Sequence, residues 1–175
     1  AVEYDNLLLI ALDQYTESHK INQPWLDELL ATTDREHIFA AGHEPAFKVF
    51  NISCLDTYPD ERNLFWESLT KAGAKAYFCG HNHFYDHAVI DDGDDHSTHD
   101  IHQVIVGTGG SSLFADSEYE GDNGRWTPER IYHAQETGYV LAEVNDSEVR
   151  IIWKHRVDRS VFEDGGDSYT FTPTG

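Results

Sequence analysis

The sequence predicts an α/β fold in which parallel strands with helical crossovers are followed by antiparallel strands and a closing hairpin. Short apolar runs, typical of strands buried on both faces, alternate with helical patterns in the first part of the 175 residues. Such alternation is typical of parallel strands. Beyond residue 87 the helical periodicity ends, and short apolar runs lie between turns rich in Gly, Asp and Asn.

Three strands and two helices are expected before residue 80. The strands are residues 7–12 (LLLIAL), 37–41 (HIFAA) and 75–79 (KAYFC). Asn22 can cap the first helix, Pro24 lies in its first turn, and apolar residues follow at helical spacing. Pro59 opens the second helix and Gly73 closes it.

The later strands are shorter and more widely separated. They are residues 88–90, 101–106, 138–144 and 149–155, of which the last two form a hairpin. A polar stretch over 116–136 separates them, and the Gly-, Asp- and Thr-rich residues 164–175 are expected to form a loose tail. One domain over residues 1–163 is therefore expected.

Charge and composition exclude several function classes. Thirty-two acids against twelve bases give a net charge of −20, which repels nucleic acid and anionic membranes and favours solvated cations. No apolar run approaches the ~18 residues that span a bilayer, and acids stand where a signal peptide has bases, so we expect a soluble chain without a targeting segment. Cys54 and Cys79 are too few for a disulfide framework, and a buried free thiol is favoured over a single bridge.

Two expected strands end in the same dipeptide. Residues 37–41 run into Gly42-His43-Glu44-Pro45, and residues 75–79 run into Gly80-His81-Asn82-His83. Ligands bind beyond the carboxyl ends of parallel strands, where neighbouring loops meet. His43, His81 and His83 should therefore converge, and neutral imidazole is the commonest protein ligand for metals. Each histidine taken singly is more often an ordinary surface or core residue, but the repeated pattern favours a metal site.

These segments carry a resemblance to a family. GHEP at 42–45 and GHNH at 80–83, each behind a strand, resemble the last two metal motifs of the calcineurin-like metallophosphoesterases, which include the purple acid phosphatases. GHNHFYDH with its acidic loop, HQVIVGTGG at 102–110 and the closing hairpin also resemble secreted bacterial members. The resemblance covers nearly the whole chain, and it implies the C-terminal half of an αββα sandwich located outside the cytoplasm, extracellular or periplasmic.

The resemblance implies a dinuclear metal site. His43 and His81 would bind one metal ion and His83 the other, with Zn, Fe or Mn as divalent or trivalent ions and a small phosphate ester as substrate. Two metal ions about 3.5–4 Å apart clamp a phosphoryl group and lower the pKa of bound water towards 7. The family carries Asp-x-His, Gly-Asp and Gly-Asn-His motifs ahead of the strand that corresponds to residues 7–12, and none of them stands before that strand in this sequence. We therefore expect an isolated chain without activity, completed by an N-terminal half as its partner.

Carboxylates near the motifs are candidates for supporting roles. Glu44, Asp86 and Asp13 are the nearest substitutes for the missing carboxylates, and each is more typical of a residue that supports a ligand or faces solvent. His87 is expected to face solvent. Ser111 and Ser112, after the GTGG turn, have no base placed for them and are not expected to be nucleophiles.

An acidic loop follows the histidine motif. Carboxylates around a glycine turn can bind Ca²⁺, but the EF-hand spacing and terminal Glu are missing, so a solvated hairpin tip is favoured over a calcium loop. The carboxylates of this loop are those of Asp91, Asp92, Asp94 and Asp95.

Two functions remain open on the sequence. The first is the C-terminal half of a metal-dependent phosphoesterase. The second is a non-catalytic structural or metal-binding extracellular module with a vestigial site. Nucleic-acid binding is disfavoured by the negative charge and by the lack of a basic stripe, whereas a phosphodiesterase with a nucleotide substrate stays open because metal ions can outweigh the local repulsion.

Overall fold

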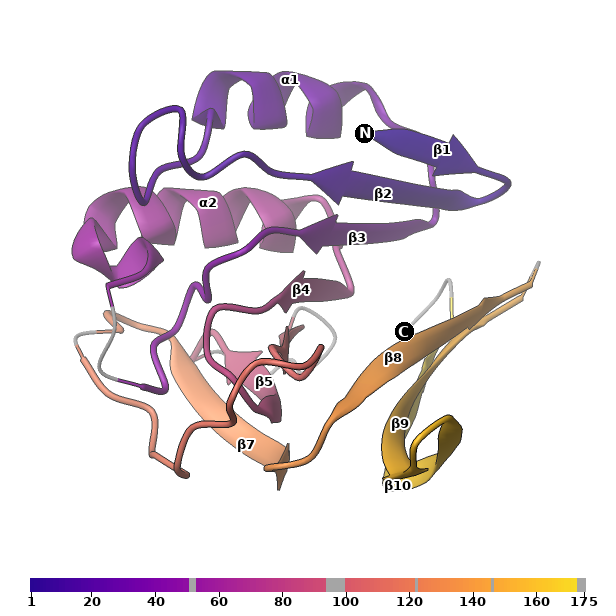
Figure 1. The fold of residues 1–175 in the computed structure, drawn as a ribbon. Coiled ribbons are helices and arrows are strands. Elements are labelled where there is room, and N and C mark those ends of the chain that lie inside the picture. The colour runs from indigo at the N-terminus through magenta and orange to yellow at the C-terminus, as the bar shows by residue number, and fades with distance from the viewer. Residues whose placement is uncertain (51–52, 94–99, 122, 146, 173–175) are drawn as a thin grey trace.

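The computed structural model describes residues 1–50, 53–93, 100–121, 123–145 and 147–172, and it confirms the expected α/β fold (Figure 1). Within these residues, one sheet has seven strands in the order β1-β2-β3-β4-β6-β5-β7, and a second has three in the order β10-β9-β8. The strands of the larger sheet are β1 (Val2–Tyr4), β2 (Leu7–Ala11), β3 (His37–Ala41), β4 (Ala76–Cys79), β5 (Tyr85–Asp91), β6 (Ile101–Val106) and β7 (Thr127–Ala134). Those of the smaller sheet are β8 (Gly138–Val144), β9 (Val149–Asp158) and β10 (Val161–Phe171).

The centre of the larger sheet is parallel. β2, β3, β4 and β6 pair in parallel, whereas β1 pairs antiparallel with β2, and β5 pairs antiparallel with both β6 and β7. Helix α1 (Gln23–Thr32) connects β2 to β3, and α2 (Pro59–Lys71) lies between β3 and β4, after the short 3-10 helix Leu55–Thr57. The carboxyl ends of β3 and β4 therefore lie side by side, as the repeated Gly-His pattern requires.

Both helices begin where the sequence predicts, and the second also ends as predicted. The Asn22 side chain accepts a hydrogen bond from the Trp25 backbone N–H at 3.3 Å, which caps α1. Pro59 is the first residue of α2, and Gly73 follows that helix with a φ of +70°, a conformation that favours glycine. None of the described helices is long and apolar enough to cross a membrane.

The larger sheet has a core on each face. On one face, Leu8 and Ile10 of β2 pack with α1 and α2 through Leu26, Trp66 and neighbouring side chains. On the other face, residues of β3, β4 and β6 pack against the three-stranded sheet, with Phe39 meeting Phe171 and Val149. The layers are thus helix, large sheet, small sheet (Figure 1).

Three strands lie where the sequence predicts no strand. β1 precedes the first expected strand, and β7 lies inside the expected polar stretch 116–136. Residues 164–171 of the expected loose tail belong to β10, which pairs with β9 along most of its length. This tail is ordered because Phe171 packs on Phe39 and because the Asp167 carboxylate is buried among partners on β5.

A chain of buried polar side chains joins the two sheets. Asp167 of β10 accepts hydrogen bonds from the Tyr85 hydroxyl at 2.6 Å and from Nδ1 of His87 at 2.9 Å. Nε2 of His87 lies 2.6 Å from Nδ1 of His102, and the Tyr169 ring stacks on both imidazoles. The expectation that His87 faces solvent is wrong, because this residue is 1% exposed and its partners come from both sheets.

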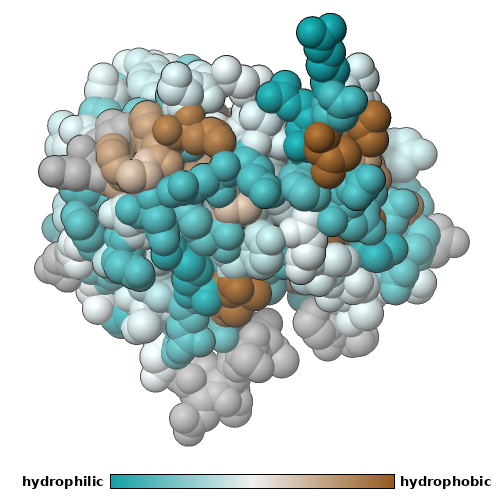
Figure 2. Space-filling view, turned by 60° about the horizontal axis from the view of Figure 1, so that its bottom comes forward, coloured by the Kyte–Doolittle hydropathy of each residue, from teal (hydrophilic) through white to brown (hydrophobic). Residues whose placement is uncertain are grey.

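The face of the molecule shown in Figure 2 is mostly hydrophilic or intermediate in hydropathy. On the face shown in Figure 2, apolar residues form separate patches between hydrophilic ones. Cys54 and Cys79 are both buried free cysteines, as expected.

Candidate metal centre

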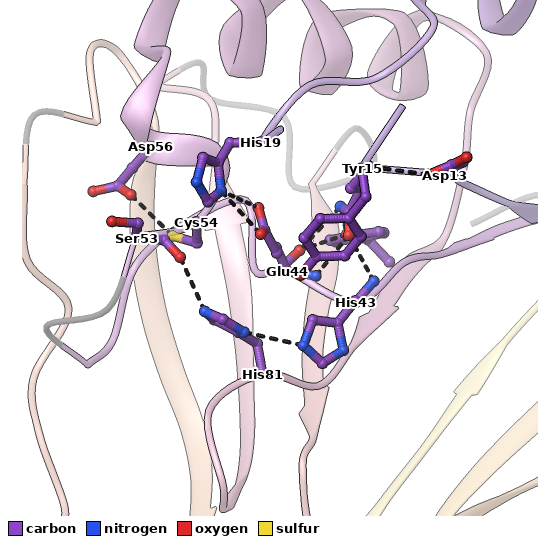
Figure 3. A network of polar contacts seen from close by, with 11 residues as sticks. Asp13, Tyr15, His19, His43, Glu44, Ser53, Cys54, Asp56 and His81 are labelled. Carbon is purple, nitrogen blue, oxygen red and sulfur yellow. Dashed lines mark hydrogen bonds and ion pairs between the residues drawn. The ribbon is translucent and has the colours of Figure 1, made fainter. Parts of the chain in front are cut away.

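Two histidines meet at the carboxyl ends of β3 and β4 (Figure 3). Nδ1 of His81 lies 3.0 Å from Nε2 of His43, and the two rings are nearly perpendicular. The Gly80 backbone N–H donates to the His43 carbonyl at 2.9 Å, so the two loops are also joined through the main chain. The structure therefore brings His43 and His81 together, as the parallel strands predict.

A backbone carbonyl fixes the orientation of the His81 ring. Nε2 of His81 lies 2.9 Å from the Ser53 carbonyl oxygen, which can only accept a hydrogen bond. The tautomer that satisfies this carbonyl has its proton on Nε2 and a lone pair on Nδ1, facing His43. Burial lowers the pKa of His81, which favours the neutral ring. His81 also has a φ of +64°, an uncommon conformation outside glycine that is typical of residues held in place by their surroundings.

His83 has different neighbours. Its ring stacks on Phe114 with centroids 4.3 Å apart, and its Nδ1 lies 3.0 Å from the Ser112 carbonyl oxygen. In the described part of the chain, the only group of three potential ligands with all ligand atoms within 4.8 Å of one another is Asp91, Asp92 and Asp100. His83 thus does not complete a compact three-ligand group with His43 and His81, and the assignment of these histidines as ligands stays a prediction.

The Gln14 side chain binds the backbone of the GHEP loop. Its Oε1 accepts hydrogen bonds from the backbone N–H groups of His43 at 2.6 Å and Glu44 at 2.7 Å. Its Nε2 donates to the Tyr77 hydroxyl at 2.7 Å, and that hydroxyl donates to the Glu44 carbonyl at 2.6 Å. A methyl group on Gly42 would lie 2.5 Å from the Tyr77 hydroxyl, so glycine is required for this close approach.

The Glu44 carboxylate is bound by His19 and does not face the histidine pair. Both of its carboxylate oxygens lie within 3.0 Å of Nδ1 of His19, and the residue is fully buried. Tyr15 lies against the same carboxylate and over the His43 ring, with ring centroids 6.0 Å apart (Figure 3). Burial, with the hydrogen bond to Glu44, raises the pKa of Tyr15 to about 12, so this phenol stays neutral.

Asp86 belongs to another cluster. Its carboxylate is fully buried on β5 and accepts hydrogen bonds from the Tyr119 hydroxyl at 2.7 Å and from Nδ1 of His133 at 2.9 Å. Nε of Arg130 lies 2.7 Å from the same carboxylate. Through these three partners, Asp86 joins β5 to β7 and to the segment that precedes β7. Its role is therefore structural.

The other predicted carboxylates lie apart from the histidines. The Asp13 carboxylate accepts hydrogen bonds from the Tyr15 backbone N–H and the Thr16 hydroxyl, which turns the chain after β2. Asp91 and Asp92 of the acidic loop gather with Asp100, and Asp91 accepts a hydrogen bond from the Gly93 backbone N–H. Asp94 and Asp95 lie outside the described residues.

The GTGG segment packs directly under the GHNH turn. A methyl group on Gly107 would lie 1.8 Å from the Asn82 carbonyl oxygen, so only glycine allows the two segments to touch. The Gly107 backbone N–H donates to the Phe84 carbonyl at 3.1 Å, which closes the contact. The segment thus packs closely against the GHNH turn, and the expected tight turn within it stays a prediction.

Gln14, Tyr15 and His19 surround the histidine pair but were not predicted from the sequence. All three follow β2, whose carboxyl end lies at the same edge of the sheet as those of β3 and β4. The argument that selected the two Gly-His strand ends applies equally to Gln14 and Tyr15, so strand order alone was a signal that could have found them.

Comparison with known proteins finds structures of similar fold but no matching sequence family. No protein-family model matches the chain, and no curated protein matches it in sequence. The solved structure of purple acid phosphatase PPD1 from yellow lupin (Lupinus luteus) seeds is similar, with a TM-score of 0.69, 16% identity, and coverage of 98% of this chain and 32% of that one. This likeness is one of fold, over nearly the whole of this chain and about a third of that structure.

Two further structures share this fold. GAP50, described as the anchor in the inner membrane complex of Plasmodium, has a TM-score of 0.60 and 16% identity over 90% of this chain and 48% of that one. PhoD has a TM-score of 0.58 and 11% identity over 87% of this chain and 33% of that one. This chain therefore spans about a third to a half of the length of the structures that it matches.

The residues at the site fit part of a metal centre. His43 and His81 offer two facing imidazole nitrogens in orientations that the Ser53 carbonyl and the Gln14 side chain hold in place. The buried carboxylate nearest to them in sequence, Glu44, is already bound by His19. Among the residues that the structure describes, the histidine pair thus offers imidazole ligands without a free carboxylate beside them to bridge two adjacent cations.

Proposed function

We propose that this chain is the C-terminal half of a metal-dependent phosphoesterase that hydrolyses small phosphate esters when an N-terminal half completes it. The observation that carries the proposal is the 3.0 Å approach of His43 and His81 at neighbouring strand ends. A fold similar to that of a purple acid phosphatase over 98% of the chain supports it.

His43 and His81 would hold one metal ion, and His83 would hold a second. Zn, Fe or Mn ions bound there would supply Lewis acidity and an activated water for attack on phosphorus. Other residues of the chain hold these histidines in position. The lowered pKa of His81 keeps that ring neutral, and Gln14 holds the His43 backbone rigidly.

The isolated chain should not turn over substrate. Two metal ions at a short distance repel each other unless an anionic ligand bridges them, and the Glu44 carboxylate beside His43 is already bound to His19. The missing bridge would come from the N-terminal half, in the same longer chain or as a separate fragment, and the completed protein would act outside the cytoplasm.

Metal content and activity, measured on the native protein together with its intact mass, test this proposal. We expect two metal ions per completed domain and hydrolysis of p-nitrophenyl phosphate that stops when a chelator removes them. The chain of residues 1–175 alone is the matched control and should be inactive. A completed domain that holds metal but hydrolyses no phosphate ester would overturn the proposal, and turnover by the isolated chain would overturn its dependence on a second half.

One observation favours a second function. GAP50 shares the fold and is described as an anchor. By that analogy, this chain would be a structural or metal-binding extracellular module in which the histidines remain from an ancestral site. Native material without an N-terminal half and without stoichiometric metal would support this alternative.

A further inference from the structure

A cavity of about 790 Å³ lies between the loop after β2 and the first turn of α1. Its volume is in the range of small-molecule sites. The Leu12 backbone N–H on its wall donates to the Ala41 carbonyl at 2.8 Å, two residues before His43. The cavity therefore lies at the same edge of the sheet as the candidate metal centre.

One loop separates the cavity from the histidines. Tyr15 lies over His43 on one side of this loop, and Asp13 points away from the histidine pair (Figure 3). Asp13, Thr16 and Glu17 line the cavity on the other side. The hydrogen bonds that Asp13 accepts from the Tyr15 backbone N–H and the Thr16 hydroxyl fix the shape of this wall.

The lining combines apolar surface with negative charge. The Trp25 side chain, which is 37% exposed, and Pro24 at the start of α1 provide apolar surface. Three carboxylates, those of Asp13, Glu17 and Glu61, face one ammonium group, that of Lys20, so the lining carries a net charge of −2 (three minus one).

Lys20 does not make the cavity cationic. Its Nζ lies 2.9 Å from Glu61 and 3.8 Å from Glu17, so its charge is shared between two carboxylates. Hydrogen bonds lower the pKa of Asp13, which keeps this carboxylate charged at neutral pH. An aromatic ring together with excess carboxylate is the arrangement that attracts an organic cation.

We infer that this cavity binds a small organic cation with apolar groups, such as a quaternary ammonium, carried by the alcohol portion of the substrate. The assignment to the substrate rests on the proposed function, whereas the preference for a cation rests on the cavity alone. The cavity and the pair lie at the same edge of the sheet on opposite sides of one loop, so a phosphate ester whose alcohol carries such a cation would span that loop to place its phosphoryl group at the histidine pair.

Binding by the chain of residues 1–175 tests the inference without any turnover. Choline and its neutral isostere 3,3-dimethylbutan-1-ol are titrated separately, and calorimetry records the affinity of each. We expect choline to bind more tightly than the alcohol, and we expect its affinity to fall as salt rises, because charge contributes. Equal affinity for the two probes, or no binding of choline, would overturn the inference.

Variants locate the binding in the cavity. Trp25→Ala should weaken choline binding about 3- to 10-fold, and Trp25→Phe should restore part of it, because Phe keeps an aromatic face. Asp13→Asn should weaken it as well while keeping an oxygen that accepts the hydrogen bonds of the loop. Tyr4→Ala is the matched control, since Tyr4 is an exposed aromatic residue on β1 outside the cavity. Unchanged choline affinity in both Trp25 variants would overturn the inference.

The two proposals fail separately. Choline binding without phosphatase activity of the completed domain would reject the proposed function and leave the cation site standing. Phosphatase activity with no preference for choline phosphate over a neutral alkyl phosphate would reject the assignment of the cation to the substrate and leave the proposed function standing.

Discussion

Nδ1 of His81 lies 3.0 Å from Nε2 of His43, so imidazoles from two consecutive parallel strands point their ring nitrogens at the same volume. Each ring has its own support, the Ser53 carbonyl for His81 and Gln14 for the backbone of His43. His43 and His81 would hold one transition-metal ion through these two nitrogens, and the rings would turn to point both lone pairs at it, because bonds from a metal to imidazole nitrogen are about 2.0–2.1 Å long.

Removal of either ring should remove this metal binding. We expect one Zn²⁺ ion per isolated chain by calorimetric titration, and His81→Ala should weaken its affinity by more than the roughly 10- to 100-fold that follows loss of a supporting partner. His83→Ala should have a smaller effect in the isolated chain, because His83 lies on Phe114 instead of at the pair. His155→Ala on β9 is the control. Equal losses for His81→Ala and His155→Ala would show that Zn²⁺ binds elsewhere.

Because the GTGG segment touches the GHNH turn at Gly107, we expect a side chain at this position to destabilise the fold. Because a methyl group would lie 1.8 Å from the Asn82 carbonyl oxygen, Gly107→Ala should reduce the free energy of unfolding by about 3 kcal/mol or more. Gly109→Ala, two residues further on, meets nothing within 4 Å and should change stability by less than about 0.5 kcal/mol. Urea denaturation of both variants measures the difference, and similar midpoints for the two would contradict the packing.

Local patterns predicted the elements that bury an unbroken apolar face. Residues 37–41 and 101–106 are strands with the expected bounds, and the Asn22 cap begins α1 as expected. The meeting of His43 and His81 followed from the same reasoning, since parallel strands place their carboxyl ends together. Fold class and half of the candidate site thus come from periodicity and strand order.

The missed strands owe their order to distant contacts. β10 carries Glu163, Asp164 and Asp167, which read as loop, yet Asp167 is buried because Tyr85 and His87, some 80 residues away, bind it. A buried carboxylate is tolerated only with such partners, and no local pattern shows them. The same network explains why His87 is buried although its neighbours in sequence suggest a turn.

Gln14 should be as important for stability as a core residue. Gln14→Ala removes the acceptor of two short hydrogen bonds, from the His43 and Glu44 backbone N–H groups, and leaves those donors next to buried structure. We expect the free energy of unfolding to fall by about 2–3 kcal/mol and Zn²⁺ affinity to fall with it. Thermal and urea denaturation check the first effect, with Gln135→Ala, an exposed glutamine, as the control. A stable Gln14→Ala variant would show that water can replace the amide.

Acid should destabilise the contact between the two sheets through His102. Burial, with the neighbouring His87, lowers the pKa of His102 from 6.5 to about 3. The pKa of His102 is lower in the folded state than in the unfolded state, so unfolding takes up a proton between about pH 3 and pH 6.5. The stability that the neutral ring contributes is therefore present above pH 6.5 and is lost as the pH falls towards 3.

Asp167 should also make the fold less stable in acid, as His102 does, but at a lower pH. Burial alone would raise the pKa of Asp167, but the hydrogen bonds from His87 and Tyr85 lower it below 3.8 overall. Its contribution is therefore present above pH 3.8 and is lost as the pH falls below that value. Between pH 6 and 4, the loss of stability should come mainly from histidine.

The His102→Gln variant separates these contributions. Glutamine keeps a hydrogen-bonding side chain beside His87 but has no proton to take up, so the slope of unfolding free energy against pH between pH 6 and 4 should shrink by up to about 1.4 kcal/mol per pH unit. Urea denaturation at several pH values measures the slope, and His155→Gln, which changes a partly exposed histidine on β9, is the control. If the wild-type chain and His102→Gln have the same slope, the buried imidazole is not the group that makes the joined sheets sensitive to acid.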